Sequence, residues 1–486
     1  MADDREPHEL NVSLEKLAYI IVKAREFTDS QPHELPLIGT VWLPLPHLLL
    51  LPFASIDTLF FSGIAGSLIG IPFLIGTGVL LFLTLRSITG SIPVAFLMAC
   101  LYGLNPNVVY MSLTPMDEPS LIFFISFAGY ALYRWLTTES VMWFFLSAVA
   151  VMLATLCRYE AWPLAPVVLV AGISRALQRR RELKNRDAIR YVALAAVSLA
   201  GMAFWVLWHA IVFGNPLRFT KGTYSVLSAA YRESSQSLPL NIVETFGRAI
   251  LIIFGPALLI IATAAFIPLR RKDADRRPIL TLIFFAIPLL FTLTAALAGY
   301  VGIDEWWWNW RYVLTFGLFL AVAGGIGLVE ILKRMPNTAS RGIVIASLLA
   351  MPLIQLARPS VGVAVYKDAA KCIDSTVRDA MIVGEQFAGI YKSGSIGLLT
   401  NENYIIRIQI ASGLPLKQFR VIHYSGEREL PDSILPSDKY LVLQKDQKPE
   451  SDLLASSSFG GTDRLLDKFE LRFENEHFAL LERKPR

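Results

Sequence analysis

The sequence predicts a mainly α-helical fold, in which a polytopic membrane bundle of about ten spans precedes a C-terminal soluble α/β domain. The first observation is composition: 54% of the 486 residues are hydrophobic and only 17% are charged, unlike a soluble globular domain. The second is that apolar runs of about 17 to 25 residues, long enough to cross a bilayer as a helix, recur up to Arg358. The third is the fall in hydropathy after that residue, where short helix-like and strand-like segments follow.

Ten apolar runs are long enough to span a membrane, the shorter ones with tilting or local thinning of the bilayer. They lie at 59–85, 88–105, 119–137, 140–157, 161–177, 189–213, 243–269, 279–301, 312–333 and 342–358.

The loops between these runs differ in charge, and this difference predicts which side of the membrane each loop occupies. Those dense in Lys and Arg should face the cytoplasm by the positive-inside rule. These basic loops are 174–190, 270–277 and 333–341. The opposite face then carries the loops at 106–118, 214–242 and 302–311 and the segment around Arg158.

The same count divides the chain into three regions. Residues 1–58 form an outer-face N-terminal segment, 59–358 the transmembrane region and 359–486 an extracytoplasmic soluble α/β domain. The stretch "WLPLPHLLLLPFASI" (42–56) is apolar but short and holds three prolines, so we interpret it as interfacial or re-entrant. Because residues 1–58 are placed outside, we expect a leading membrane helix that is missing from this chain.

In the last region, "YKDAAKCIDSTVRDAMIVGEQFAGIYK" is helix-like, "SIGLLT", "FRVIHY" and "KYLVLQK" are strand-like, and "FELRFEN" with "HFALLERK" predicts a hairpin. It contains no Gly-rich phosphate loop and no nucleophile elbow. We interpret it as a lid or docking domain over the outer face.

Composition also argues against two classes of function. The net charge of +5 comes largely from the short basic loops, and no nucleic-acid-binding motif accompanies them. The three cysteines, Cys100, Cys157 and Cys372, have neither disulfide nor metal-ligand spacing, so no zinc site is indicated.

Two adjacent acids, Asp117 and Glu118, stand at the start of an apolar run in "NPNVVYMSLTPMDEP" (105–119). Placing a charged side chain in hydrocarbon costs roughly 2.5 to 3.5 kcal/mol of free energy, so we expect this pair to contact water, to have an ionic partner or to have a function. One explanation is helix capping, because the helix dipole and free backbone N–H groups stabilise carboxylates there. The other is chemistry, which the neighbouring outer junctions favour.

Three other outer junctions also concentrate polar groups. "RYEAW" (158–162) joins a cation, a carboxylate and aromatic rings, and the long loop 213–233 carries several Lys, Arg and hydroxyl groups. "GIDEWWWNWRY" (302–312) is rich in tryptophan, which ordinarily indicates an aromatic belt at the membrane interface but also suits a sugar. Together these junctions predict group transfer from a lipid phosphate, with a carboxylate as general base and Arg or Lys stabilising the phosphate leaving group.

Five stretches, in their order along the chain, resemble a known family. They are "LIGTVWLPLPHLLLLPF" (37–53), "GLNPNVVYMSLTPMDEP" (103–119), "RYEAW" (158–162), "FGNPLRFTKGTYS" (213–225) and "WRYVL" (310–314). The chain resembles the GT-C type membrane glycosyltransferases, in the group related to protein mannosyltransferases and aminoarabinose transferases.

The resemblance implies an inverting sugar transfer from a polyprenyl- or dolichyl-phosphate donor at the outer side of the membrane. By this match Glu118 takes the acidic position of the second outer loop, and Arg158 and Arg311 take those of arginines that hold the lipid phosphate. The predicted catalytic residues are Glu118 and Asp117. The predicted substrate-binding residues are His47, Arg158, Lys221, Tyr224, Arg311 and Tyr312.

The chain departs from the family at its start. The resemblance implies an initial membrane helix and a first outer loop with a catalytic or metal-organising Asp, but that position aligns with Lys16 here. The nearest carboxylates are Glu15, Asp29 and Glu34. Either the start is truncated or misassigned, or the chain is a diverged homologue without transferase activity.

Several alternatives stay open at this point. A lipid-linked-sugar binding scaffold or a transporter would also carry ionisable residues in a membrane bundle, although the acids and arginines here lie at outer junctions and no inverted repeat is visible. The expected partners are the lipid-phosphate-linked donor, an unidentified acceptor and membrane lipids, without nucleic acid. No cofactor is certain, and a divalent metal ion joining the carboxylates is left open. The expected location is the bacterial inner membrane, with the active face outside.

Overall fold

The computed structural model describes residues 20–27, 29, 41–182, 185–220, 239–298, 309–357, 363–365, 375–400, 402–421, 438–445 and 468–485. The chain packs into two compact units. One unit combines 39–49 with 66–369, and the other combines 1–38, 50–65 and 370–486.

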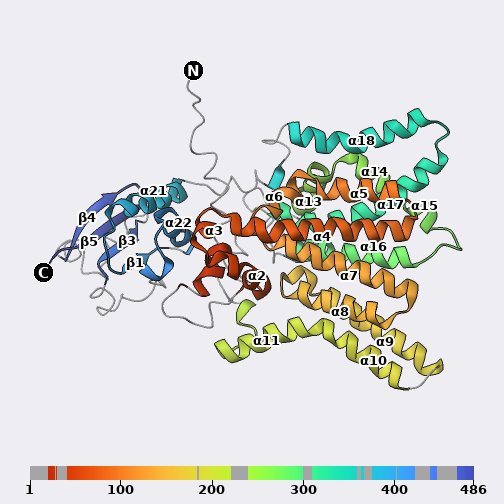
Figure 1. The fold of residues 1–486 in the computed structure, drawn as a ribbon, viewed down its shortest axis with the longest axis horizontal. Helices are drawn as coiled ribbons and strands as arrows, with labels where there is room; N and C mark the ends of the chain where they lie inside the picture. Colours follow the sequence, from red (N-terminus) through yellow and green to blue (C-terminus); the bar gives the residue numbers. More distant parts are fainter. Residues whose placement is uncertain are drawn as a thin grey trace. The chain divides into compact units, whose positions relative to one another are not determined.

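The first unit is a bundle of apolar helices (Figure 1). Its α-helices are α4 (Ile64–Thr89), α5 (Ile92–Gly103), α6 (Pro106–Ser112), α7 (Glu118–Thr138), α8 (Val141–Thr155), α9 (Leu164–Glu182), α10 (Asn185–Ala196), α11 (Ala200–Phe213), α13 (Pro239–Phe254), α14 (Pro256–Thr263), α15 (Phe266–Leu269), α16 (Arg277–Leu297), α17 (Phe316–Arg334) and α18 (Thr338–Ala357). Short 3-10 turns join them at η2 (Tyr159–Ala161), η3 (Val197–Leu199), η4 (Arg218–Thr220) and η5 (Asn309–Thr315).

These helices confirm the predicted polytopic membrane fold. Within the described residues, seven helices are long and apolar enough to cross a membrane, and two bent pairs raise the number to nine. Each of the ten predicted runs corresponds to one of these or to α8, an apolar helix of 15 residues. The segment interpreted as interfacial forms the short helix α2 (Pro44–Ala54), with Pro52 inside it.

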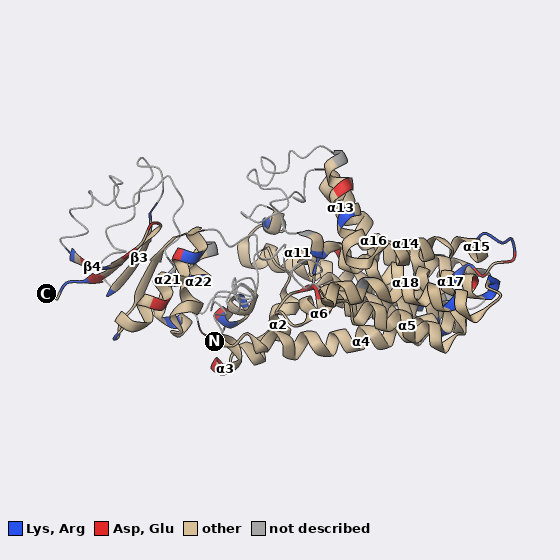
Figure 2. Cartoon of the chain, turned by 90° about the horizontal axis from the view of Figure 1, so that it is seen from above, with Lys and Arg blue, Asp and Glu red and all other residues tan. Residues whose placement is uncertain are grey.

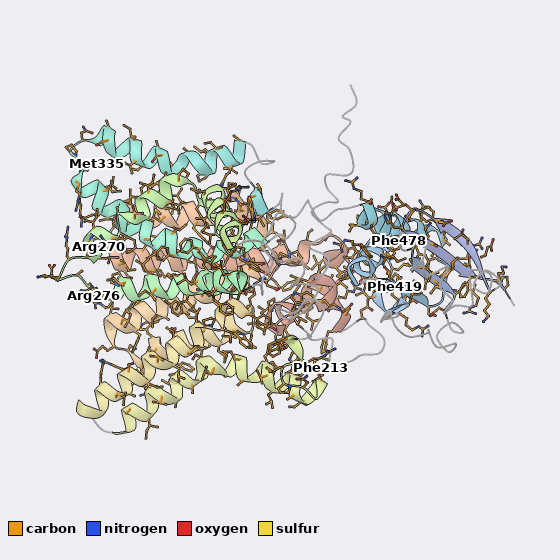
Figure 3. All side chains as sticks on the ribbon, turned by 180° about the vertical axis from the view of Figure 1, so that it is seen from behind. Phe213, Arg270, Arg276, Met335, Phe419 and Phe478 are labelled. Atoms are coloured by element: carbon orange, nitrogen blue, oxygen red, sulfur yellow. The ribbon has the colours of Figure 1, made fainter. Side chains whose placement is uncertain are left out.

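The ends of the bundle agree with the predicted alternation of loops. Figure 3 shows Arg270, Arg276 and Met335 at one end of the bundle and Phe213, the last residue of α11, at the other. Lys and Arg gather near α15 at the first of these ends, whereas the helices between the ends carry few charges (Figure 2). The structure thus groups basic loops on one side, while the assignment of that side to the cytoplasm remains a prediction from the positive-inside rule.

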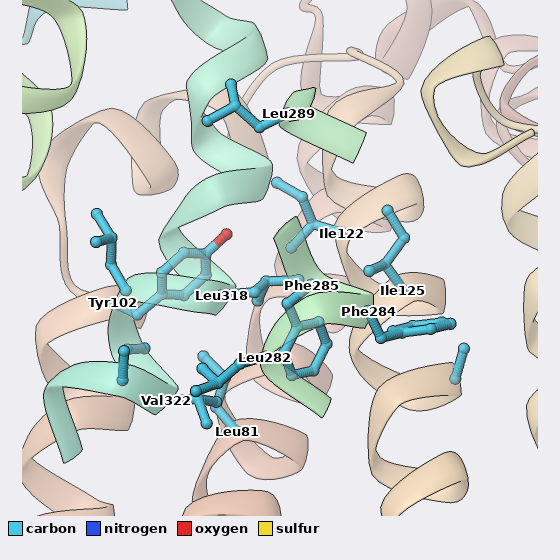
Figure 4. Packing of buried hydrophobic residues seen from close by; sticks show 14 of the residues in the cluster. Leu81, Tyr102, Ile122, Ile125, Leu282, Phe284, Phe285, Leu289, Leu318 and Val322 are labelled. Atoms are coloured by element: carbon cyan, nitrogen blue, oxygen red, sulfur yellow. The ribbon is translucent and has the colours of Figure 1, made fainter. Parts of the chain in front are cut away.

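The bundle core is apolar and closely packed. Phe284 and Phe285 of α16, each 1% exposed, lie beside Ile122 and Ile125 of α7 (Figure 4). Between membrane helices lipid chains are as apolar as these side chains, so association depends on van der Waals contact and on interhelical hydrogen bonds.

Two broken helices meet inside this core. Pro256 removes the backbone donor for the carbonyl of Ile252, and the chain bends by 100° between α13 and α14. The side chain of Gln355 donates to that carbonyl at 2.7 Å, and Asn105 donates to the carbonyl of Ile253 at 2.7 Å. Asn105 also caps α6 at the 60° bend that follows α5. Side chains from other elements therefore satisfy the α13–α14 break, whereas the N-cap residue Asn105 satisfies the α5–α6 break locally, as backbone inside a membrane requires.

Glycines allow α4 to pack closely on the α6–α7 turn, which gives a first testable prediction. A Cβ at Gly70 would lie 1.9 Å from the carbonyl oxygen of Ser112, whereas one at Gly78 on the same helix would meet nothing within 4 Å. We expect Gly70→Ala to destabilise the protein by about 1 to 3 kcal/mol through overpacking. Gly78→Ala should leave the stability unchanged or raise it.

Thermal unfolding of the detergent-solubilised variants measures this difference. A lower Tm for Gly70→Ala alone would agree with the close approach, and equal Tm values for the two variants would contradict it.

The second unit holds a five-stranded mixed sheet in the order β2-β1-β3-β5-β4. Its strands are β1 (Ile396–Leu399), β2 (Phe419–Val421), β3 (Tyr440–Gln444), β4 (Phe469–Glu474) and β5 (Phe478–Arg483). Strand β1 is parallel to β2 and β3, and β5 is antiparallel to β3 and β4, so the predicted hairpin is confirmed. The helices α21 (Ser375–Ile390) and α22 (Glu402–Ser412) pack against each other, and the turn η6 (Leu416–Gln418) leads into β2.

The N-terminal part of the chain packs with this sheet unit. Residues 20–27 are helical, and the short helix α3 (Asp57–Phe61) provides Asp57, which pairs with the buried Arg25. Asp29 pairs with Arg25 at 3.2 Å and accepts a hydrogen bond from the backbone N–H of Leu416 at 3.0 Å. Asp29, one of the acids nearest to the expected first-loop position, is thus engaged within the sheet unit.

Candidate functional site

The candidate site lies in the helical unit, where α7 begins. Pro115 and Pro119 bracket the turn that precedes α7, and Pro119 occupies its first turn, where the absence of an N–H has no cost. Asp117 stands at the N-cap and Glu118 opens the helix, with 3% and 1% exposure. The Asp117 side chain makes no capping hydrogen bond to the helix, so simple capping does not account for its position.

Two arginines converge on Glu118 from segments far apart in the sequence. The Nη1 atom of Arg158, just before η2, donates to Glu118 Oε1 at 2.8 Å. The Nε atom of Arg311, in η5, forms an ion pair with the same oxygen at 3.2 Å. Each guanidinium also lies near the Tyr312 ring, with Arg158 4.9 Å and Arg311 5.7 Å from the ring centroid.

Glu160 completes the surroundings of Arg158. Its Oε1 accepts from Arg158 Nε at 2.9 Å and lies 2.8 Å from Arg158 Nη2. Arg158 is therefore held between two carboxylates, Glu118 on one edge and Glu160 on the other. Glu160 is outside the predicted set of site residues, although the stretch "RYEAW" contains it, because a carboxylate two positions from an arginine is common on solvated surfaces.

Asp117 lies beside this network but is only weakly joined to it. Its Oδ2 is 4.0 Å from Arg158 Nη1, and its buried Oδ1 has no hydrogen-bond partner among the described residues. Burial raises the pKa of Asp117 to about 7, against the lowering effect of Arg158, and Glu118 raises it further. Asp117 can therefore exchange a proton near neutral pH.

The backbone around Arg158 is fixed by hydrogen bonds to neighbouring segments. Tyr159 donates its hydroxyl to the carbonyl of Val41 at 2.6 Å and accepts from the Trp205 indole N–H at 3.1 Å. The N–H of Leu45 donates to the carbonyl of Leu156 at 3.1 Å. The η2 turn is therefore held on both sides, which fixes the direction of the Arg158 and Glu160 side chains.

The structure thus brings together five of the predicted site residues. They are Asp117, Glu118, Arg158, Arg311 and Tyr312. His47 is buried in α2, and its part in binding the donor stays a prediction. Lys221 and Tyr224 lie outside the described residues.

The five grouped residues and Glu160 form a largely buried polar cluster, which we call the Asp117 cluster. It contains three carboxylates and two guanidinium groups. Burying charges is expensive even when they are paired, so such clusters inside membrane proteins are most often found where a ligand or a proton is handled. Its oxygens could hold a divalent cation, but no spacing in the cluster selects a particular ion.

Comparisons with known proteins find one family model that matches part of the chain and two solved structures with a similar fold. Residues 23–215 match the family model described as dolichyl-phosphate-mannose-protein mannosyltransferase. The whole chain is similar to the crystal structure of ArnT from Cupriavidus metallidurans bound to undecaprenyl phosphate, with a TM-score of 0.53 and 13% identity over 97% of this chain and 96% of that one. Its apo structure gives a TM-score of 0.52 and 11% identity over 98% and 93%.

No curated protein sequence matches the chain significantly. At 11% and 13% identity, the likeness to ArnT shows the fold alone. The predicted resemblance is nevertheless confirmed, since the family model and the solved structures agree. In sequence over residues 23–215 and in fold over nearly its whole length, the chain is similar to the GT-C type membrane glycosyltransferases.

Proposed function

We propose that this protein transfers a sugar from a polyprenyl-phosphate-linked donor to an acceptor hydroxyl at the outer face of the membrane. The observation that carries the proposal is the convergence of Arg158 and Arg311 on Glu118, beside the buried Asp117, where a membrane helix begins. The complex of ArnT with undecaprenyl phosphate supports a lipid phosphate as the donor group.

Arg311 is the group best placed to bind the phosphate. Its side chain is 27% exposed, against 12% for Arg158, so it is the more accessible of the two cations. It meets Glu118 through Nε, and within the described part of the chain its two terminal nitrogens make no ion pair. Those nitrogens form the planar pair of donors that suits phosphate oxygens.

Asp117 is the better general base of the two adjacent acids. Two guanidinium groups pair with one oxygen of Glu118, so this carboxylate is already engaged in ion pairs. Asp117 has a pKa raised to about 7 by burial, and a catalytic base works best with a pKa near the working pH. Glu118 and Glu160 then act as positioning residues, because they fix the two arginines.

The reaction balances with these roles. The acceptor oxygen forms a bond to the anomeric carbon while the bond from that carbon to the phosphate oxygen breaks. The acceptor proton passes to Asp117, and polyprenyl phosphate leaves with its charge stabilised by Arg311. The resemblance to inverting enzymes fits such a direct displacement.

A binding role without chemistry is the second candidate. The position of the expected first-loop acid aligns with Lys16, and Asp29 is engaged within the sheet unit by Arg25 and Leu416. A scaffold or a catalytically impaired homologue would retain Arg158 and Arg311 and bind a lipid-linked sugar without consuming it. A transporter would bind it and release it unchanged.

A panel of radiolabelled polyprenyl-phosphate sugars, supplied to membranes that contain the protein, tests the proposal. We expect transfer from at least one donor. Arg311→Gln should raise the KM for that donor by about 10- to 100-fold, since a hydrogen bond to a charged group contributes roughly 1.5 to 3 kcal/mol. Arg248→Gln is the matched control, because Arg248 is exposed on α13 and pairs only with Glu244 among the described residues.

Three results would decide between the candidates. Transfer that weakens in Arg311→Gln but not in Arg248→Gln supports the proposal. Binding of labelled lipid through Arg311 with no transfer from any donor would overturn it in favour of the scaffold. Movement of unchanged labelled lipid across the membrane would favour the transporter.

A further inference from the structure

A second cluster of ionisable side chains lies in the sheet unit, at the turn between β4 and β5. It comprises Glu476 and His477 from this turn and Asp379 from α21. One oxygen of each carboxylate and one ring nitrogen of His477 all lie within 4.8 Å of one another. His477 is 2% exposed, and its Nδ1 lies 2.7 Å from Asp379 Oδ2, whereas Glu476 is exposed.

Asn475 holds this turn in one conformation. Its side-chain oxygen accepts from the backbone N–H groups of His477 at 3.2 Å and Phe478 at 2.8 Å. Its side-chain nitrogen donates to the carbonyl of Asp379 at 2.9 Å. The turn and α21 are therefore fixed to each other before any ligand arrives, which lowers the entropy lost on binding.

The carboxylates of this cluster differ from those on β4 and β5, which pair with lysine or arginine. Glu470, Glu474 and Glu482 each pair with an arginine or a lysine. Among the described residues, neither Asp379 nor Glu476 has a lysine or arginine within ion-pair distance, and the His477 imidazole lies against Asp379. Two carboxylates thus converge on a buried imidazole without a fixed positive charge.

We propose that Asp379, Glu476 and His477 bind a divalent transition-metal ion such as Zn²⁺. One imidazole and two carboxylates form a mixed nitrogen and oxygen set, which suits Zn²⁺, Co²⁺ or Mn²⁺ better than Ca²⁺ or Mg²⁺. Binding would displace the proton between His477 and Asp379, and water would complete the coordination. The ion would fasten the β4–β5 hairpin to α21, because its ligands come from both. This site is independent of the Asp117 cluster and of the proposed transfer.

Equilibrium dialysis of the metal-stripped, full-length protein in detergent against Zn²⁺ tests this site. We expect Glu476→Gln and Asp379→Asn each to weaken one Zn²⁺ site by at least about 10-fold. Glu476 is exposed and Asp379→Asn keeps a hydrogen-bonding group next to His477, so both variants should fold. Glu474→Gln is the matched control, because Glu474 lies on the same hairpin and pairs with Lys445.

Thermal unfolding supplies a second readout. Zn²⁺ should raise the Tm of the wild type and of Glu474→Gln, and it should raise that of the two ligand variants less. A metal bound at the Asp117 cluster would persist in all four proteins, so the difference between them reports on the β4–β5 site alone. Equal Zn²⁺ stoichiometry, affinity and Tm shift in all four proteins would overturn the proposal.

Discussion

Asp117→Asn is expected to lower the turnover of sugar transfer by about 10²- to 10⁴-fold, the range typical of a lost general base. In the wild type, turnover should rise with pH through about 7, because burial raises the pKa of Asp117 to that value and only the deprotonated form accepts the acceptor proton. The variant should lose this rise and bind the lipid-phosphate donor with an unchanged affinity. Turnover measured between pH 5.5 and 8.5, with donor binding on the same preparations, checks both expectations.

Stability separates this catalytic role from a structural one. The folded pKa of Asp117 lies above its ordinary value of 3.8, so the folded protein binds this proton more tightly, and the contribution of Asp117 to stability falls as pH rises from about 4 to 7. A neutral Asn avoids that loss. At pH 8 the variant should therefore be at least as stable as the wild type while being inactive. A variant that is both inactive and less stable at pH 8 would contradict the assignment of Asp117 as the base.

Arg158→Met should have the largest effect on stability. Breaking a buried ion pair by removing one partner typically costs about 3 to 5 kcal/mol, because the remaining charge stays buried. Here the loss would leave Glu160 without an ion-pair partner among the described residues and would remove one of the guanidinium groups that pair with Glu118. The Tm of the protein in detergent should fall accordingly, and donor binding should be lost with it.

A neutral partner should restore that stability without restoring activity. In the double variant Arg158→Met with Glu160→Gln, the Glu118–Arg311 ion pair stays and the uncompensated charge of Glu160 is absent, so we expect most of the Tm to return. Arg248→Met, which breaks the exposed pair with Glu244, is the control and should change the Tm little. If Arg158→Met alone leaves the Tm unchanged, the network does not hold the site together as described.

The lengths of the apolar runs were sufficient to predict the helical bundle, but they did not predict where helices bend inside it. The run 243–269 reads as one span, yet the structure bends it by 100° at Pro256. A proline inside an apolar run can indicate such a bend. Proline is also tolerated in continuous membrane helices, however, when neighbouring groups satisfy the freed carbonyl. Gln355 and Asn105, which supply those groups here, lie far away in the sequence.

Five members of the Asp117 cluster could be named from the sequence, but Glu160 and the contacts within the cluster could not. Asp117 and Glu118 stand out because acids at the start of an apolar run are costly. Nothing local indicates that Arg158, 40 positions away, and Arg311 share a single oxygen of Glu118, because that depends on how α7, η2 and η5 pack. The raised pKa of Asp117 likewise comes from burial, which appears only in the folded chain.

The proposed metal site at the β4–β5 turn could be predicted from the sequence even less than the Asp117 cluster. The hairpin itself is predicted by the alternating strands that flank its turn. Asp379 and His477 are 98 positions apart in the sequence, so they form no short metal-binding motif. The sequence alone therefore indicates no zinc site. The three proposed ligands come together only in the folded chain, where α21 packs beside the β4–β5 turn.

The most direct test of the central claim is the release of free polyprenyl phosphate from a labelled donor by the purified protein. At pH 8, with an acceptor extract present, we expect the wild type to release polyprenyl phosphate and to label an acceptor in equal amounts. Asp117→Asn should do neither while still binding the donor. If the wild type binds the donor but releases no polyprenyl phosphate from any member of the sugar panel, the protein is not the transferase that we propose.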